Sequence, residues 1–176
     1  MSIARPKAIC AFQREIAMST HDAARELPSS EPRDPVDLSA WLDGAEAVGW
    51  EDPKAVLNLP EFAGYRSVGR KNSGRVQRCK RLDLERSGDR LALLVGLARA
   101  AAEEIDIWVG VYPTGESSRL PEDLQLAILD EAGDTVMRAI AQRTESLQFE
   151  FGGRSGEQFQ VKLALGEFST LEGFVL

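Results

Sequence analysis

An alternation of apolar and other residues runs through the C-terminal half of the chain, and it limits the fold more than any other feature. The clearest example is the segment IDIWVGVY, residues 105–112. Its residues Ile105, Ile107, Val109 and Val111 alternate with Asp106, Trp108, Gly110 and Tyr112. Successive side chains of a β-strand point to opposite faces, so this pattern predicts a strand with one face in a core.

The segment LQLAILDEAGDTVMRAIAQRT, residues 124–144, predicts a β-hairpin. Leu124, Leu126 and Ile128 are expected to face one way, and DEAGD with Gly133 reverses the chain. On the partner strand, Val136 is expected to continue the apolar face, followed by Ala139 and Ala141. The hairpin is therefore interpreted as scaffold.

Other strands are predicted on either side of this hairpin. LALLVGL (91–97) is a short apolar run typical of a buried strand. LQFEF (147–151) and EQFQVKLAL (157–165) alternate, and the glycine-rich GGRSG between them favours a tight hairpin turn. The closing residues FVL predict a further edge strand.

Together these patterns predict a mainly β fold, an antiparallel β-sandwich of about six or seven strands with a small N-terminal helical subdomain. The expected core consists of Leu93, Val95, Ile107, Val109, Leu126, Ile128, Phe149, Phe151, Phe159, Val161 and Leu163.

Two short helices are predicted before the strands. Leu38, Trp41, Leu42, Ala45 and Val48 form one apolar stripe, which predicts a helix over 38–48 that Asp37 caps and Gly49 ends. A second helix is expected after Asp52, with Pro53 in its first turn, Val56 and Leu57 buried and Pro60 at its end. Helices this short need a larger body to rest on.

The chain is accordingly divided into four parts. Residues 1–35 form a variable segment that ends in the proline-rich linker PSSEPRDP, and residues 36–65 form the helical subdomain. Residues 66–81 form a basic loop or edge, and residues 82–176 form the sandwich.

No motif for catalysis, cofactor binding or metal binding stands out. His21 is the single histidine, and no nucleophile motif surrounds Cys10 or Cys79. The acidic residues of DEAGD suit a turn better than a calcium loop, and the glycine-containing loops lack the pattern of a phosphate loop. We therefore expect no enzyme, although a carboxylate-based enzyme is kept as a third reading.

Cysteine usage and hydropathy indicate a cytoplasmic protein. The two cysteines are far apart, which predicts neither a disulfide framework nor a zinc site. The N-terminus lacks the apolar core of a secretory signal, and no run approaches the ~18 apolar residues of a membrane span.

Residues 66–81, RSVGRKNSGRVQRCKR, are basic in a chain whose formal charge is -7. The cations that we single out are Arg70, Lys71, Arg75, Arg78, Lys80 and Arg81. Direct nucleic-acid binding is disfavoured, because the segment has no aromatic residue for base stacking and the rest of the chain is acidic. Either a solvated loop or a contact with an acidic protein surface fits the pattern.

Four stretches resemble, in order and spacing, a family of uncharacterised bacterial proteins best known from cyanobacteria. They are LSAWLDGAEAVGW, CKRLDLERSGDRLALLVGL, VYPTGESSRLPEDLQLAILDEAGD and GRSGEQFQVKLALGEFSTLEGFVL. The resemblance covers roughly residues 36–176. The most specific positions are Pro113, Thr114, Gly115, Leu120, Pro121, Leu129, Asp130, Gly133, Gly156, Glu157, Phe159, Leu165, Gly166 and Phe174. Residues 1–35 depart from the family's pattern.

The resemblance implies a regulator, because the family has no established enzyme activity. Its members tend to be encoded beside extracytoplasmic-function sigma factors, in some cases with caspase-like CHAT proteases linked to phage defence. An anti-sigma-like inhibitor, released by cleavage, is therefore expected.

The expected contacts with the sigma factor are the helical residues Trp41, Leu42 and Trp50 and the basic segment. The alternative for Trp41 and Trp50 is that both pack on the sandwich. The alternative function is a small-ligand or carbohydrate-binding module that uses Trp108 and Tyr112.

Overall fold

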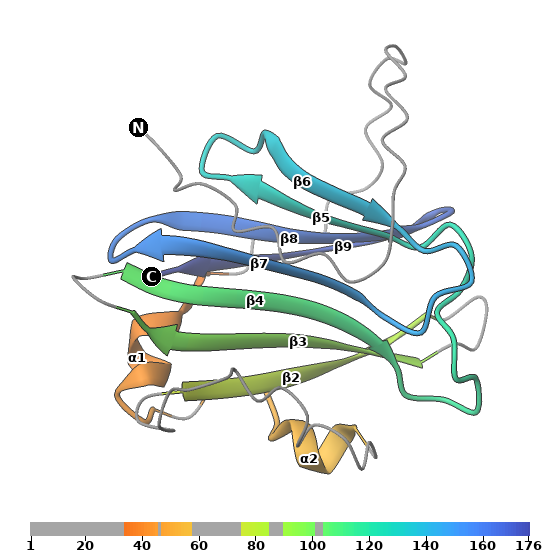
Figure 1. The fold of residues 1–176 in the computed structure, drawn as a ribbon, viewed down its shortest axis with the longest axis horizontal. Coiled ribbons are helices and arrows are strands. Elements are labelled where there is room, and N and C mark those ends of the chain that lie inside the picture. Colours follow the sequence, from red (N-terminus) through yellow and green to blue (C-terminus); the bar gives the residue numbers. More distant parts are fainter. Residues whose placement is uncertain (1–33, 46, 58–74, 85–89, 101–103) are drawn as a thin grey trace.

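The computed structural model describes residues 34–45, 47–57, 75–84, 90–100 and 104–176, and these residues form two packed β-sheets with two short helices (Figure 1). The helices are α1 (Leu38–Leu42) and α2 (Pro53–Val56). The strands are β1 (Val36–Asp37), β2 (Arg75–Asp83), β3 (Arg90–Arg99), β4 (Glu104–Pro113), β5 (Gln125–Asp130), β6 (Thr135–Ile140), β7 (Leu147–Arg154), β8 (Gln158–Leu165) and β9 (Phe168–Val175).

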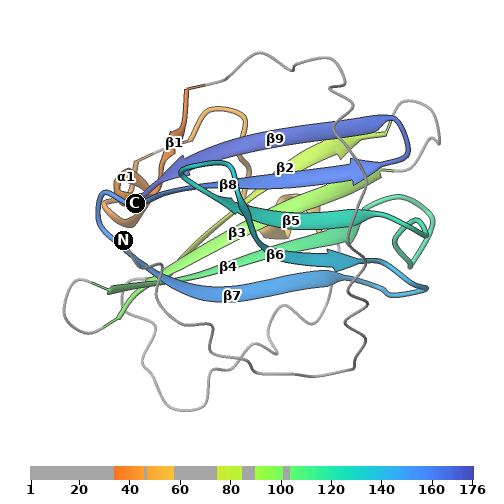
Figure 2. The ribbon, with the colours of Figure 1, turned by 90° about the horizontal axis from the view of Figure 1, so that it is seen from above.

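The five-stranded sheet, sheet A, has the order β1-β9-β8-β5-β6, and the four-stranded sheet, sheet B, has the order β2-β3-β4-β7. Neighbouring strands are antiparallel except for β1 and β9, which are parallel. Figure 2 shows sheet A lying over sheet B. The predicted antiparallel sandwich is therefore confirmed, with more strands than expected because β1 and β2 join the two sheets.

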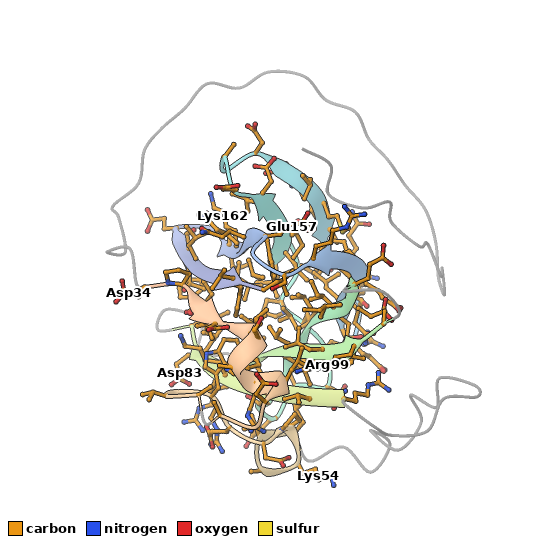
Figure 3. All side chains as sticks on the ribbon, turned by 90° about the vertical axis from the view of Figure 1, so that its left-hand side faces the viewer. Asp34, Lys54, Asp83, Arg99, Glu157 and Lys162 are labelled. Carbon is orange, nitrogen blue, oxygen red and sulfur yellow. The ribbon has the colours of Figure 1, made fainter. Side chains whose placement is uncertain are left out.

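The predicted core lies between the sheets. All of its members are buried except Phe149, which is half-buried and packs against them. In β4 the isoleucine and valine stripe faces this core, as its alternation predicts. Figure 3 shows side chains filling the space between the sheets, with labelled charged residues such as Lys54 and Lys162 toward the outside.

Strand β3 is apolar on both faces because both faces are covered, which the sequence did not reveal. Leu91, Leu93 and Val95 point into the sandwich, while Ala92 and Leu94 point the other way and are also buried. This second side forms a smaller apolar cluster with Cys79, Tyr112 and Leu57, with half-buried Val56 of α2 packed against it. A strand that is covered on both faces has no need for alternation.

The predicted β5–β6 hairpin is confirmed, with one correction. Gly133 has a φ of 87°, and Asp130 Oδ1 accepts hydrogen bonds from the amides of Ala132 and Asp134, at 3.0 and 2.9 Å. This carboxylate holds the turn. Val136 is not on the buried face but 45% exposed.

The reason is the parity of the strand, because residues that alternate with Met137 and Ala139 point away from the core. The register shift between Ile128 and Leu129 leaves Val136 without a partner in the ladder. Met137 lies opposite Ile128 and, with Ala139, packs against the core in place of Val136.

Both helices form where expected but are shorter. Asp37 caps α1 and Asp52 caps α2, each by accepting a hydrogen bond from a backbone amide, and Pro53 opens α2. The predicted helix over 38–48 is wrong beyond Leu42, because Gly44 adopts a φ of 90° that ends the helix. Ala45 and Val48 are consequently exposed. Helix α2 ends at Val56, before the predicted stop at Pro60.

The aromatic residues of the helical region belong to the sandwich core. The ring centroids of Trp41 and Trp50 lie 5.1 Å apart, and Trp50 lies 5.7 Å from Phe174 of β9. Leu38, Trp41 and Trp50 share one cluster with both sheets. The division of the chain at residue 65 stays a prediction, since residues 58–74 lie outside the described part.

The predicted hairpin between β7 and β8 is wrong, although a tight turn is present. Gly156 has a φ of 88°, and Glu157 Oε2 accepts a hydrogen bond from the Arg154 amide at 2.9 Å. Strand β7 pairs with β4 in sheet B, whereas β8 pairs with β5 and β9 in sheet A. The chain crosses between sheets here, so that Phe151 and Phe159 meet in the core with ring centroids 5.3 Å apart.

The predicted final edge strand is longer than FVL. It begins at Phe168 and pairs with β8 along its length. In the described part of the chain, its other side pairs only with the two residues of β1. Within the described ranges, no helix is long and apolar enough to cross a membrane.

Gly96 in β3 provides a test of the outer packing of sheet B. A methyl group at this position would overlap the Trp108 ring. We expect Gly96→Ala to lower the free energy of unfolding by about 1–3 kcal/mol, because the ring must move. Urea unfolding checks this value, with Gly152→Ala as the control because nothing lies within 4 Å of a Cβ there. Equal stability of the two variants would contradict the packing.

Candidate partner-binding surfaces

Strand β2 carries Arg75, Arg78, Lys80 and Arg81, four of the cations singled out in the sequence. It is an edge strand of sheet B, so residues 75–81 form the edge rather than the loop. Arg70 and Lys71 lie outside the described residues. The alternation of a strand divides the four cations between two environments.

Lys80 points into the sandwich. It lies opposite Leu93, and its Nζ donates a hydrogen bond to Glu172 Oε1 of β9 at 2.6 Å. Both side chains are largely buried, with exposed fractions of 17% and 5%. The Lys80 Nζ also lies 5.9 Å from the Trp50 ring centroid. This ion pair connects the two sheets and is not available to a partner.

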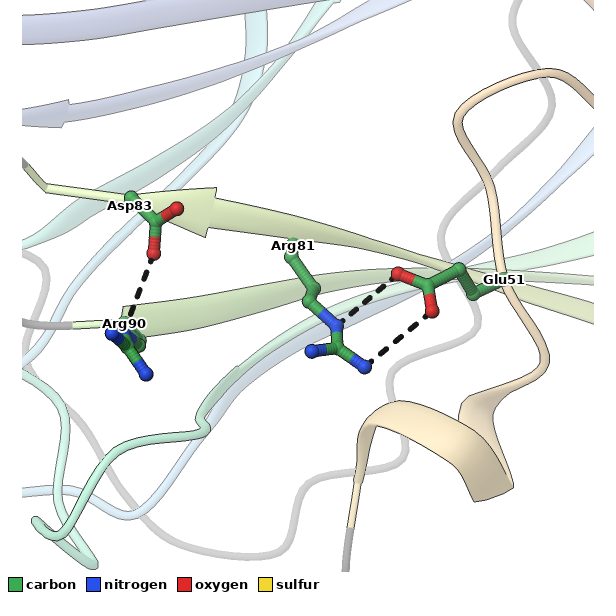
Figure 4. Close-up of polar contacts among 4 residues, drawn as sticks. All are labelled: Glu51, Arg81, Asp83 and Arg90. Carbon is green, nitrogen blue, oxygen red and sulfur yellow. Dashed lines mark hydrogen bonds and ion pairs between the residues drawn. The ribbon is translucent and has the colours of Figure 1, made fainter.

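Arg81 points outward and contacts Glu51 (Figure 4). Its Nε lies 3.1 Å from Oε1, and its Nη2 lies 3.4 Å from Oε2. The Glu51 backbone in turn exchanges two hydrogen bonds with Cys79, at 2.7 and 2.9 Å. Glu51 therefore covers the middle of the β2 edge with both its side chain and its backbone.

The two remaining cations of β2 are also engaged. The Arg75 guanidinium lies 4.1 Å above the Trp108 ring, a cation–π contact. Arg78 is half-buried and donates to the carbonyl of Gln77 at 3.4 Å. The structure thus brings the four described cations together on one strand but gives each an internal partner.

The predicted helical contacts are not on the surface either. Trp41 and Trp50 are 2% and 8% exposed, and Leu42 is half-buried against the core. This arrangement corrects the expectation of an exposed aromatic patch and matches its alternative. The physical reason is that helices of four and five residues are stable only when their large side chains are buried.

The outer face of sheet B is partly covered. Tyr112 is buried and its hydroxyl accepts a hydrogen bond from Gln148 Nε2 at 2.7 Å, while Trp108 is half-buried. These rings therefore do not form the open aromatic platform that carbohydrate binding uses. Cys79 lies in the same cluster, and burial, with the nearby Glu51 charge, raises the pKa of its thiol to about 12.

The outer face of sheet A was missed by the sequence reasoning. The outward positions of its strands β5, β6, β8 and β9 are Gln125, Ala127, Leu129, Val136, Arg138, Ile140, Gln158, Gln160, Lys162, Ala164, Ser169, Leu171, Gly173 and Val175. None of these is acidic, although the whole chain has 28 acidic residues. The short edge strand β1 adds Asp37, opposite Val175. We call the surface of the four strands β5, β6, β8 and β9 the acid-free face.

Three large aliphatic side chains are exposed on the acid-free face. Val136 is 45% exposed, and Ile140 and Leu171 are each 41% exposed. Lys162 and Arg138 lie in one row with Leu171 across the sheet, and Arg138 donates to Gln125 Oε1 at 2.7 Å. In the sequence, the outward positions of the predicted strands of this face could have indicated this surface, because together they contain aliphatic and basic residues but no acidic residue.

Nothing in the described residues assembles a metal site, because no group of three or more His, Cys, Asp and Glu side chains lies close enough together. His21 and Cys10, the other residues considered for chemistry, lie outside the described residues. The surfaces above are therefore the candidate site.

The buried ion pair gives a stability prediction. Lys80→Met or Glu172→Leu alone should cost about 3–5 kcal/mol, because each leaves one buried charge without its partner. The double variant should cost less than either single variant. A double-mutant cycle by urea unfolding measures the coupling. Additive effects of the two changes would show that the pair does not interact.

The Cys79 thiol gives a second prediction. In a Cys10→Ser chain, iodoacetamide at about pH 8 should not modify folded Cys79 but should modify the urea-unfolded chain. Because folding raises its pKa from 9.0 to about 12, the thiol's contribution to stability is complete below pH 9 and is lost as the pH rises toward 12. Mass spectrometry reads the modification. Equal labelling of both states would mean that the cluster under α2 is open.

Comparison with known proteins gives one family and no individual relative. No curated protein and no solved structure matches the chain. One family model matches residues 53–175, from the start of α2 to the end of β9, which is more than half of the chain. The chain therefore belongs to the family described as Protein of unknown function (DUF1822).

Proposed function

We propose that this chain is a non-enzymatic regulator that binds another protein in the cytoplasm, and that its acid-free face contacts this partner. The observation that supports this proposal is the exposure of Val136, Ile140 and Leu171 on four strands whose outward positions carry no carboxylate. Exposed apolar side chains grouped on a rigid surface are typical of protein-binding sites. A sheet is rigid, so little conformational entropy is lost when a partner docks.

The charges of the acid-free face and of the rest of the chain indicate which kind of partner surface would bind. Arg138 and Lys162 give the acid-free face a positive charge, so the rest of the chain is even more acidic than the formal charge of -7 indicates. The face therefore suits an apolar surface flanked by carboxylates. The acidic remainder suits a partner that is otherwise basic. A protein with helices of mixed charge meets both conditions.

An extracytoplasmic-function sigma factor is the partner that we propose. The resemblance to cyanobacterial family members encoded beside such factors supports this choice. The promoter-contacting regions of a sigma factor are basic, so an acidic chain that binds nearby would keep them from DNA. In this proposal the chain is an anti-sigma-like inhibitor.

We also propose that a caspase-like CHAT protease cleaves this chain during phage defence and thereby releases the sigma factor. Residues 70–81 are rich in arginine and lysine, a composition that makes an exposed loop a candidate cleavage region. Residues 75–81 lie in β2, where backbone pairing with β3 opposes entry into a protease. We therefore propose that the cut falls outside β2.

A binding experiment tests the acid-free face. In a pull-down with an extracytoplasmic-function sigma factor of the same host, Leu171→Glu and Ile140→Glu should each weaken binding by about tenfold or more, because each places a carboxylate on the face. Val48→Glu is the matched control, since Val48 is also an exposed aliphatic residue but lies in the loop after α1. A transcription assay measures whether stoichiometric addition of the wild-type chain silences the sigma factor.

Two outcomes would contradict the proposal. If the folded wild-type chain, at micromolar concentration, neither captures nor silences the sigma factor, the partner is wrong. If it does so and the two face variants bind as tightly as Val48→Glu, the surface is wrong. Circular dichroism confirms that each variant is folded.

A further inference from the structure

A cleft of about 400 Å³ lies at the end of the sandwich where β3 begins and β4 ends. It is lined by the first residues of β3, by Pro113 and Gly115 after β4, and by the loop that leads to β5. The motif residues Pro113, Gly115 and Pro121, singled out in the sequence, lie in its wall. The protein-binding function proposed above makes no use of this cleft.

We infer that this cleft binds a small molecule through its carboxylate or phosphate group. Arg90 and Arg119 both line it, and a guanidinium presents several N–H donors to an oxyanion. Among the described lining residues, Glu116 is the one carboxylate, so the two arginines outnumber it. Asp83, outside the lining, contacts Arg90.

Both guanidinium groups are available to a ligand. The Nε of Arg90 lies 3.7 Å from Asp83 Oδ1, and both side chains are about three-quarters exposed, at 73% and 76% (Figure 4). An exposed pair at this distance contributes little and is readily exchanged for a ligand oxyanion. For Arg119, the described residues provide no side-chain partner.

The backbone around the cleft is fixed. The Thr114 amide donates to the Arg90 carbonyl at 2.8 Å, and the Leu120 amide donates to the Thr144 carbonyl at 2.9 Å. The Ser117 hydroxyl accepts from the Arg119 amide at 3.2 Å and donates to the Arg119 carbonyl at 2.8 Å. With prolines at both ends of the loop, the two arginines extend from a preorganised frame, which lowers the entropic cost of binding.

Gly115 keeps the cleft open. A Cβ at this position would have only the Arg90 amide nitrogen within 4 Å, at 3.9 Å. Its φ is not positive, so a larger residue is accepted without backbone strain. A leucine at this position would therefore occupy space in the cleft and leave the fold unchanged.

An NMR titration of the full chain tests the inference. Sodium phosphate and sodium succinate serve as the probes for the two oxyanions, with sodium chloride at matched ionic strength as the reference. At least one probe should shift the amide signals of Gly115, Ser117 and Arg119 with a Kd in the millimolar range or tighter. The probe that binds identifies the group that the natural ligand carries.

The variants assign the shifts to the cleft. Arg119→Gln and Gly115→Leu should each weaken binding by about tenfold, the first by removing a donor and the second by filling space. Glu116→Gln should tighten binding several-fold, because it removes the repelling carboxylate. Arg154→Gln is the control, since Arg154 lies opposite Glu104 at the other end of β4 and should leave the Kd unchanged.

The inference is overturned if neither probe shifts these amides beyond the sodium chloride reference. It is also overturned if the Kd for Arg119→Gln and Gly115→Leu equals that of the wild type. Leu171→Glu on the acid-free face should not change the anion affinity, so failure of the proposed protein-binding function and failure of this inference are separate results.

Discussion

Two sheet faces rich in Leu, Ile, Val and Phe must meet before either is stable in water, and every other feature of this chain depends on that contact. Sheet B supplies residues such as Leu93 and Val109, and sheet A supplies Leu126, Val161 and Phe174. Burial of this area is the largest favourable term in the fold. Trp41 and Trp50 extend the same core at the end where the helices lie, which explains why such short helices are ordered.

The two outer faces of the sandwich differ in how far other residues cover them. The outer face of sheet B is covered in part by Val56 and Leu57, and its strand β3 is apolar on both sides. On the outer face of sheet A, Pro35 lies near Gly173, and the rest of the face combines exposed aliphatic side chains with two cations. This asymmetry directs a protein partner to sheet A. The arginine-lined cleft lies apart from both faces, at one end of the sandwich, where loops rather than strands form the walls.

The candidate site shows where sequence reasoning succeeds and where it does not. The basic segment was identified, and its position at an edge was one of the expectations. What these cations contact was not predictable, because Lys80 meets Glu172 across 92 residues of sequence and Arg75 meets the Trp108 ring. A cluster of like charges in a sequence says little about exposure when a strand sends alternate side chains to opposite faces. The acid-free face draws residues from four strands, and the same limit applies to it.

The sequence by itself determined where the strands from β3 to β9 lie, most of the residues with which they face the core, and where the chain turns. These properties follow from a period of two and from local turn chemistry at residues such as Asp130 and Gly133. Only the tertiary structure decided that β7 and β8 belong to different sheets and that Val136 points outward. It also decided that Lys80 and Glu172 form an ion pair between the sheets. Strand pairing, bulges and contacts between sheets join residues far apart in the chain, and a local pattern carries no information about which distant segment will supply the partner.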